Sequence, residues 1–114
     1  MSTFCDLSKG HCAPCEGIGQ ALEETEARAQ LAALPGWQLA ADARSIGKEF
    51  AFKNFKETML FVNGVAWMAE AEGHHPDLEV GYARCKITWT THALNGLSMN
   101  DFIGAAKVEA LLTA

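Results

Sequence analysis

The chain has 114 residues, enough for about one domain with a modest hydrophobic core. Hydrophobic residues make up 49% and charged residues 20%, proportions that fit a globular domain and exclude a disordered tail, a collagen or a coiled coil. Fourteen acidic residues against nine basic ones give a net charge of −5, which argues against a direct nucleic-acid partner because phosphate binding needs clustered Lys and Arg.

The first residues do not match a targeting signal. They contain Asp6, Lys9 and His11 and lack the roughly 7–15-residue apolar stretch of a signal peptide. No run reaches the roughly 18 apolar residues of a membrane span. We therefore expect a cytoplasmic protein without a membrane partner, in a compartment where thiols stay reduced and structural disulfides are rare.

Cysteine and histidine fall into two clusters. Three of the four Cys and one His lie within residues 5–15, and the other three His lie within residues 74–92. Residues 1–19 show little apolar periodicity, so we expect an irregular, Cys-rich extension there. A single domain is then expected over residues 20–114.

The domain is predicted to begin with a helix over residues 20–34, whose early turns are acidic and which Pro35-Gly36 ends. A β-hairpin is predicted to follow, with a short strand at residues 37–39 and a second strand at residues 45–52 in which alternate residues share a face. Lys48 interrupts the apolar face of the second strand, so we expect that position near a sheet edge.

Residues 55–72 carry the strongest helical pattern. Asn54 is a good N-cap, Glu57 stands three residues on as in a capping box, and Gly73 supplies a C-terminal stop. Apolar side chains extend beyond one stripe, so this helix is predicted to be central and covered on more than one side. These side chains belong to Phe55, Met59, Leu60, Phe61, Val62, Val65, Ala66, Trp67, Met68 and Ala69.

Two strands and a helix complete the chain. Clear alternation over residues 83–91 places Cys85 on the apolar face of a strand, and residues 78–82 are a shorter partner. A last helix is predicted to begin near Ser98. The order α-β-β-α-β-β-α predicts an α+β fold, a two-layer sandwich in which a four-stranded antiparallel sheet carries three helices on one face.

A polar segment, Glu70-Ala-Glu-Gly-His74-His75-Pro76-Asp77, joins the central helix to the next strand. Pro76 favours an extended conformation at the residue before it. Glu70 precedes His74 by four residues, so its carboxylate is expected to orient that imidazole on the last helical turn. His92 ends the long strand, and if strand and helix end at the same rim, three imidazoles can converge there.

Histidine has an unperturbed pKa of about 6.5, so two or three imidazoles around a pocket suit paired proton donation and removal without a cofactor. Solvated loop histidines and a metal site are the alternatives, since His and Glu are good metal ligands. The His-Glu-x-x-His spacing of familiar metal helices is absent.

The pattern resembles the pterin-4a-carbinolamine dehydratase (4a-hydroxytetrahydrobiopterin dehydratase) family. The resemblance covers about residues 22–112 and implies the same fold, a homodimer or homotetramer, and no cofactor. Its features stand in order along the chain: Glu70-x3-His74-His75-Pro76, Tyr82, Ile87-Thr-Trp-Thr-Thr-His92, Gly96-Leu97 and Asp101-Phe102.

The resemblance implies a hydro-lyase that dehydrates 4a-hydroxytetrahydropterin to quinonoid dihydropterin, which recycles tetrahydrobiopterin for aromatic amino acid hydroxylases. An acid must protonate the C4a hydroxyl before it leaves, and a base must take the N5 proton. By resemblance, His74 and His92 would transfer protons and His75 would bind the pterin or stabilise charge. The positions that would bind substrate or orient these groups are Glu70, Pro76, Asp77, Thr91 and Asp101. One departure is Leu78, where the family often has an aromatic residue.

Two further hypotheses stay open. Members of the family also act as non-catalytic dimerisation or assembly factors on the same fold. In the extension, Cys12-Ala-Pro-Cys15 is a single CxxC with two further ligand types nearby, so a zinc site formed by Cys5, His11, Cys12 and Cys15, a redox-active pair and no special chemistry all remain.

Overall fold

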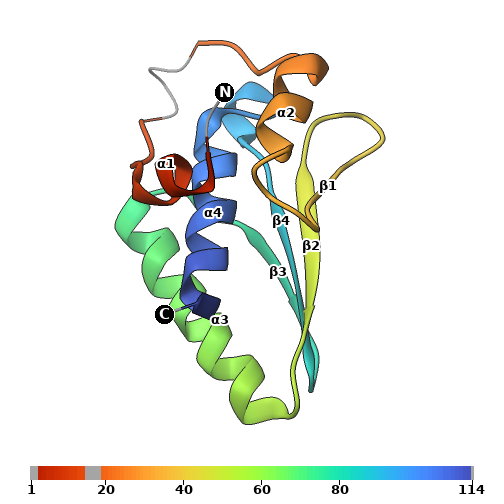
Figure 1. The fold of residues 1–114 in the computed structure, drawn as a ribbon, viewed down its shortest axis with the longest axis vertical. Coiled ribbons are helices and arrows are strands. Elements are labelled where there is room, and N and C mark those ends of the chain that lie inside the picture. The colour runs from red at the N-terminus through yellow and green to blue at the C-terminus, as the bar shows by residue number, and fades with distance from the viewer. Residues whose placement is uncertain (1–2, 15–18, 114) are drawn as a thin grey trace.

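The structure is a computed structural model that describes residues 3–14 and 19–113 (Figure 1). Its elements follow one another as α1 Phe4–Lys9, α2 Glu24–Leu31, β1 Gln38–Leu39, β2 Ile46–Ala51, α3 Phe55–Glu72, β3 Asp77–Val80, β4 Arg84–Trp89, a 3₁₀ turn at His92–Leu94, and α4 Met99–Thr113. No helix in the described ranges is long and apolar enough to cross a membrane.

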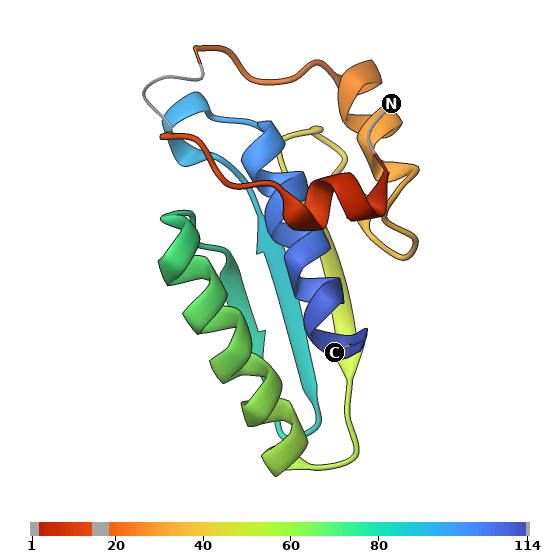
Figure 2. The same cartoon turned by 60° about the vertical axis from the view of Figure 1, so that its left-hand side comes forward.

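The four strands form one antiparallel sheet in the order β1-β2-β4-β3. Helices α3 and α4 lie side by side on one face of it (Figure 2). The predicted α+β architecture is therefore confirmed. Asp77 at the start of β3 pairs with Thr88 near the end of β4, so the segment that follows α3 and the segment that follows β4 lie at the same rim of the sheet.

The core lies between this sheet and the two long helices. In β4, Cys85, Ile87 and Trp89 are fully buried, and their neighbours along the strand are not, as the predicted alternation requires. On β2, the residues from Lys48 onward have no partner in β1, so the expected edge position is confirmed. The Lys48 ammonium lies over the Phe50 ring and contacts Glu109 on α4.

The central helix α3 begins and ends where its capping residues predict. The Asn54 side chain accepts a hydrogen bond from the Glu57 N–H at 2.9 Å, and Gly73 ends the helix in the left-handed conformation with φ of 68°. The expectation that other elements cover this helix on more than one side is wrong within one chain. Leu60 and Trp67 on its outer face are 63% and 81% exposed.

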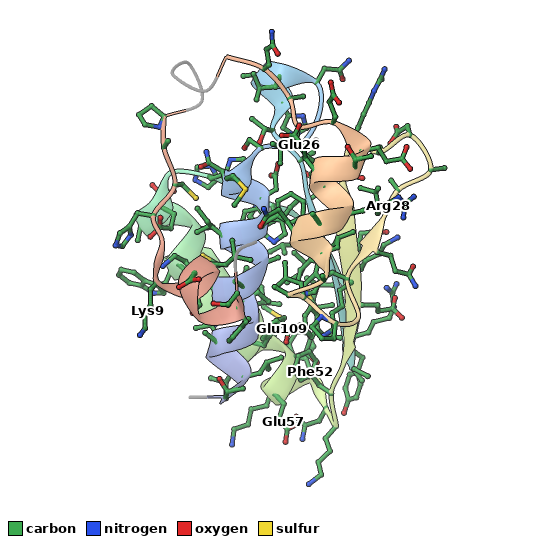
Figure 3. The ribbon with its side chains drawn as sticks, turned by 45° about the horizontal axis from the view of Figure 1, so that its top comes forward. Lys9, Glu26, Arg28, Phe52, Glu57 and Glu109 are labelled. Carbon is green, nitrogen blue, oxygen red and sulfur yellow. The ribbon has the colours of Figure 1, made fainter. Side chains whose placement is uncertain are left out.

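Two expectations for the amino-terminal region also need correction. The first domain helix spans only Glu24–Leu31, because Glu23 has an extended backbone and caps it together with Glu26. The extension is not wholly irregular, since Phe4–Lys9 forms α1. A capping box between Thr3 and Asp6 starts α1, and Leu7 is buried against the domain. Residues 3–14 are thus packed on α4 and on the end of α3 (Figure 3).

Candidate active site

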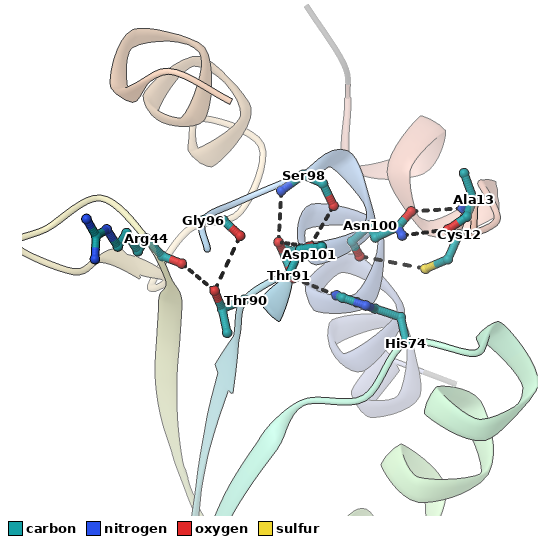
Figure 4. Close-up of polar contacts among 10 residues, drawn as sticks. All are labelled: Cys12, Ala13, Arg44, His74, Thr90, Thr91, Gly96, Ser98, Asn100 and Asp101. Atoms are coloured by element: carbon teal, nitrogen blue, oxygen red, sulfur yellow. Dashed lines mark hydrogen bonds and ion pairs between the residues drawn. The ribbon is translucent and has the colours of Figure 1, made fainter. Parts of the chain in front are cut away.

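The end of α3 places His74 inside the molecule. Gly73 reverses the chain in the left-handed conformation, and the His74 N–H then bonds to the Ala69 carbonyl at 3.3 Å. This turn directs the His74 side chain into the interior beside the end of α3, and the residue is only 6% exposed. Its Nε2 lies 2.6 Å from Oδ1 of Asp101, which is fully buried in the first turn of α4 (Figure 4).

The second carboxylate oxygen of Asp101 accepts two hydrogen bonds from residues before and at the start of α4. Asp101 Oδ2 accepts the Ser98 N–H at 2.9 Å and the Thr91 hydroxyl at 2.8 Å. Because the single hydroxyl proton of Thr91 goes to Asp101, the Ser98 hydroxyl at 2.8 Å must donate to Thr91. The Ser98 N–H, three residues before Asp101, therefore helps to fix the carboxylate beside the histidine.

These contacts also determine which ring nitrogen of His74 carries a proton. An ionised carboxylate can only accept hydrogen bonds, so the His74 Nε2 that faces Asp101 is the protonated nitrogen. In the neutral imidazole, Nδ1 is then the unprotonated atom. A fixed carboxylate that orients an imidazole in one tautomer is the arrangement that a general base requires.

The plane of the His74 ring is set by Trp89. The two rings stack with centroids 5.4 Å apart and planes 15° from parallel. Trp89 has room for this position because α4 carries Gly104 opposite it, and a Cβ there would lie 2.6 Å from the indole ring. The Asp101 contact and the Trp89 stacking together leave the imidazole little freedom to rotate.

The expectation that Glu70 orients His74 is wrong. Glu70 Oε1 lies 2.9 Å from Nε2 of His75, and both side chains are largely exposed. The spacing of four residues brings two side chains together only within a helix, and Gly73 ends the helix before His74. Asp101, a position assigned by resemblance, is the carboxylate that contacts His74.

The other predicted site residues lie at the same rim, where β3 begins and β4 ends. His92 is exposed and begins the 3₁₀ turn after β4. Asp77 is exposed at the start of β3, and Pro76 before it is half-buried. Thr91 is buried, and its hydroxyl belongs to the Asp101 network.

Sequence reasoning did not identify the residues that attach the extension to this site. Glu72 accepts the Cys12 N–H at 2.7 Å and contacts the His11 ring at 3.0 Å. The Asn100 side chain makes two hydrogen bonds to the backbone of Ala13. No motif marks Glu72 or Asn100, although each stands close in sequence to a predicted site residue.

The zinc hypothesis for the extension gains no support from its described members. Burial, together with the negative charges of Glu72 and Asp101, raises the pKa of the Cys12 thiol to about 12. A zinc ligand must be a thiolate, and the His11 ring is already engaged with Glu72. Cys15 and the side chain of Cys5 lie outside the described part of the structure. Among the side chains that the structure describes, no group of three or more His, Cys, Asp or Glu is placed to hold a metal ion.

An apolar hollow of about 630 Å³ lies elsewhere, between α1, the end of α2 and the end of α4. Its lining includes Phe4, Leu34 and Pro35, and its one titratable side chain is Glu109. Such a surface offers no paired proton donor and acceptor, so the histidine rim remains the candidate active site.

Acidification tests the contacts of Glu72. Burial alone would raise the pKa of this carboxyl, but the Cys12 N–H, His11 and Lys107 hold it below its ordinary value of 4.5. A pKa that is lowered on folding contributes stability above the unfolded value, and that stability is lost as pH falls through the folded value. The unfolding free energy of wild type should therefore exceed that of Glu72→Gln at about pH 7, and the difference should shrink below about pH 4.5.

Urea unfolding followed by circular dichroism measures this difference. Glu57→Gln, at the exposed opposite end of α3, is the matched control. A wild-type advantage over Glu72→Gln that stays constant down to about pH 3 would contradict the assigned contacts.

Comparisons with known proteins show which family this chain belongs to. A family model described as pterin 4 alpha carbinolamine dehydratase matches residues 20–111. Proteins named provisionally as pterin-4-alpha-carbinolamine dehydratases are similar over nearly the whole chain. One from Legionella pneumophila (strain Corby) is 55% identical over 94% of this chain and 96% of its own. One from Nitrosomonas eutropha (strain DSM 101675 / C91 / Nm57) is 53% identical over 98% of each.

Two solved structures share the fold. The crystal structure of a transcriptional coactivator/pterin dehydratase from Brucella melitensis is 35% identical with a TM-score of 0.77, and the match covers 81% of this chain and 98% of that one. A pterin dehydratase-like protein identified as a RuBisCO assembly factor in the alpha-carboxysome is 26% identical with a TM-score of 0.59, over 68% of this chain and 90% of that one. On the family model and these relatives, the chain belongs to the pterin-4a-carbinolamine dehydratase family.

Proposed function

We propose that this protein dehydrates 4a-hydroxytetrahydropterin to quinonoid dihydropterin by histidine acid and base catalysis, and so recycles tetrahydrobiopterin for aromatic amino acid hydroxylases. The observation that carries the proposal is the buried His74–Asp101 pair at the rim that also holds His75 and His92. A reaction of this kind needs two proton transfers and no electron transfer, so imidazoles suffice without a cofactor. The free thiols of Cys12 and Cys85 are compatible with the proposed cytoplasmic location, where thiols stay reduced.

The reaction requires two proton transfers at neighbouring atoms of the pterin. An acid gives a proton to the C4a hydroxyl, the C4a–O bond breaks, and water leaves with the bonding electron pair. A base takes the proton from N5, and the N–H electron pair forms the C4a=N5 double bond. No atom is oxidised by an external acceptor, and the proton taken from N5 replaces the one given to the leaving water.

The proposed roles combine the geometry of the site with the family resemblance. His74 is held in one plane and one tautomer, which suits it to proton transfer, and the resemblance assigns the other transfer to His92. His75, with Glu70 beside it, lies exposed at the rim and contacts the pterin. Asp101 and Thr91 orient His74, and Pro76 and Asp77 shape the chain next to the substrate.

The dehydratase assay tests this proposal. Purified protein is expected to accelerate the loss of 4a-hydroxytetrahydropterin absorbance, and His74→Ala or His92→Ala should each remove most of that acceleration, since a positioned acid or base contributes about 10²–10⁴-fold. Glu57→Ala, at the exposed opposite end of α3, should leave the rate near that of wild type. Absence of acceleration by the intact chain would contradict the proposal and favour a non-catalytic assembly role.

We also propose that the chain forms a homodimer or homotetramer through the outer face of α3. Leu60 and Trp67 are seven residues apart on this helix, so they lie on the same face, and both are largely exposed. Large apolar side chains grouped on one helix face mark a protein interaction surface. A non-catalytic dimerisation or assembly factor would use the same surface, so this feature alone does not distinguish the two functions.

Sedimentation velocity measures the association. Trp67→Glu should shift the protein toward monomer, because burying the new charge against an apolar partner is costly. Gln38→Glu, an exposed position on β1, is the matched charge control and should sediment as wild type does. A wild-type chain that remains monomeric at high concentration would rule out self-association through this face.

A further inference from the structure

The contact between His74 and Asp101 connects the end of α3 to the start of α4, and the extension connects the same two helix ends a second time. At the end of α3, Glu72 Oε1 accepts the Cys12 N–H at 2.7 Å. At the start of α4, Asn100 Oδ1 accepts the Ala13 N–H at 2.9 Å and Asn100 Nδ2 donates to the Ala13 carbonyl at 2.8 Å. Two consecutive residues of the extension therefore hold both helix ends at once.

This bridge runs beside the His74–Asp101 contact. Glu72 stands two residues before His74, and Asn100 is the residue before Asp101. The Cys12 Sγ lies 3.8 Å from the Asn100 carbonyl, which belongs to the peptide bond that leads into Asp101 (Figure 4). A change in the separation of the two helix ends would therefore alter both bridges together.

One side of the bridge is a buried group and the other is a partly buried one. Asn100 is 2% exposed, and the Glu72 side chain is 10% exposed. An amide or carboxylate that is shielded from water costs more when it loses its partner than an exposed one does, so these contacts favour the attached position of the extension. Upstream, Lys107 on α4 donates to the Ser8 carbonyl at 3.0 Å and lies 3.7 Å from Glu72.

The reactivity of the Cys12 thiol shows whether residues 11–13 are in contact with Glu72 and Asn100. Burial and the charges of Glu72 and Asp101 raise the pKa of this thiol to about 12, so it stays protonated and unreactive while residues 11–13 are in place. If those residues detach, the thiol gains water and loses the nearby negative charges. Its pKa then falls toward the ordinary value of 9.0, and its alkylation accelerates.

We propose that residues 11–13, named here the strap, act as a positioning element for catalysis, in which the backbone of Cys12 and Ala13 ties Glu72 to Asn100 and thereby sets the distance between His74 and Asp101. Glu72 and Asn100 are positioning residues in this scheme and do not touch substrate. The kinetic part of the inference rests on the proposed dehydratase function, and the structural part does not.

The decisive variants are Glu72→Ala and Glu72→Gln in the full-length chain. Glu72→Ala removes the acceptor for the Cys12 N–H, whereas Glu72→Gln keeps an oxygen acceptor at the same place. In Glu72→Ala we expect faster alkylation of Cys12 by iodoacetamide, located by tandem mass spectrometry, and a kcat lower by about 10-fold with little change in KM. Glu72→Gln should retain most of the wild-type kcat, and Glu57→Ala, at the opposite end of α3, should match wild type.

Ala13→Pro is a second variant, and it leaves the sequence of both helices unchanged. It removes one contact of the strap, because proline lacks the N–H that donates to Asn100 Oδ1. It should repeat the effects of Glu72→Ala. The ring signals of ¹⁵N-labelled His74 are recorded in all variants, and they should move in Glu72→Ala and Ala13→Pro alone. This readout needs no turnover, so it tests the strap even if the intact chain proves inactive as a dehydratase.

Two results would overturn the inference. If Cys12 alkylation accelerates in folded Glu72→Ala and Ala13→Pro while kcat and the His74 signals stay unchanged, the strap only stabilises the fold. If neither substitution accelerates alkylation, these contacts do not hold the strap.

Discussion

The buried contact between His74 and Asp101 is the constraint on which the rest of the site depends. A fully buried carboxylate is costly unless its oxygens accept hydrogen bonds, and Asp101 accepts three, from His74, Thr91 and Ser98. These donors come from the end of α3, the end of β4 and the start of α4. One residue therefore fixes how three elements meet, and leaving a buried hydrogen-bonding group without its partner typically costs about 1–3 kcal/mol.

Much of the fold could be predicted from the sequence, because the signals for it are local. Alternation identifies β4, and Asn54 and Gly73 identify the ends of α3. The identity of the partner of His74 was not predictable from spacing, since it depends on the backbone at Gly73. A left-handed residue there turns His74 inward and leaves Glu70 outside, where it contacts His75. The candidate histidines were found at the predicted rim, but their partners required the tertiary structure.

The structure of the extension was likewise only partly predictable from local sequence patterns. Its short helix α1 begins with a capping box between Thr3 and Asp6, a signal too brief to outweigh the lack of periodicity over residues 1–19. Its contacts with Glu72 and Asn100 join residues about 60 and 90 positions apart, and no local pattern encodes such contacts. The alignment with the Legionella relative covers 94% of this chain, so most of the extension lies within the shared sequence.

The turnover of an Asp101→Asn variant tests the central claim most directly. The oxygen of the new amide would still accept from Ser98 and Thr91, so its NH₂ group would face His74 Nε2 and force the ring proton onto Nδ1. We predict a folded protein whose dehydratase kcat is lower by at least about 100-fold, as expected when a catalytic imidazole is held in the wrong tautomer. Glu79→Gln, an exposed position on β3, is the matched control and should keep the wild-type activity. A folded Asp101→Asn variant with wild-type kcat would contradict the account.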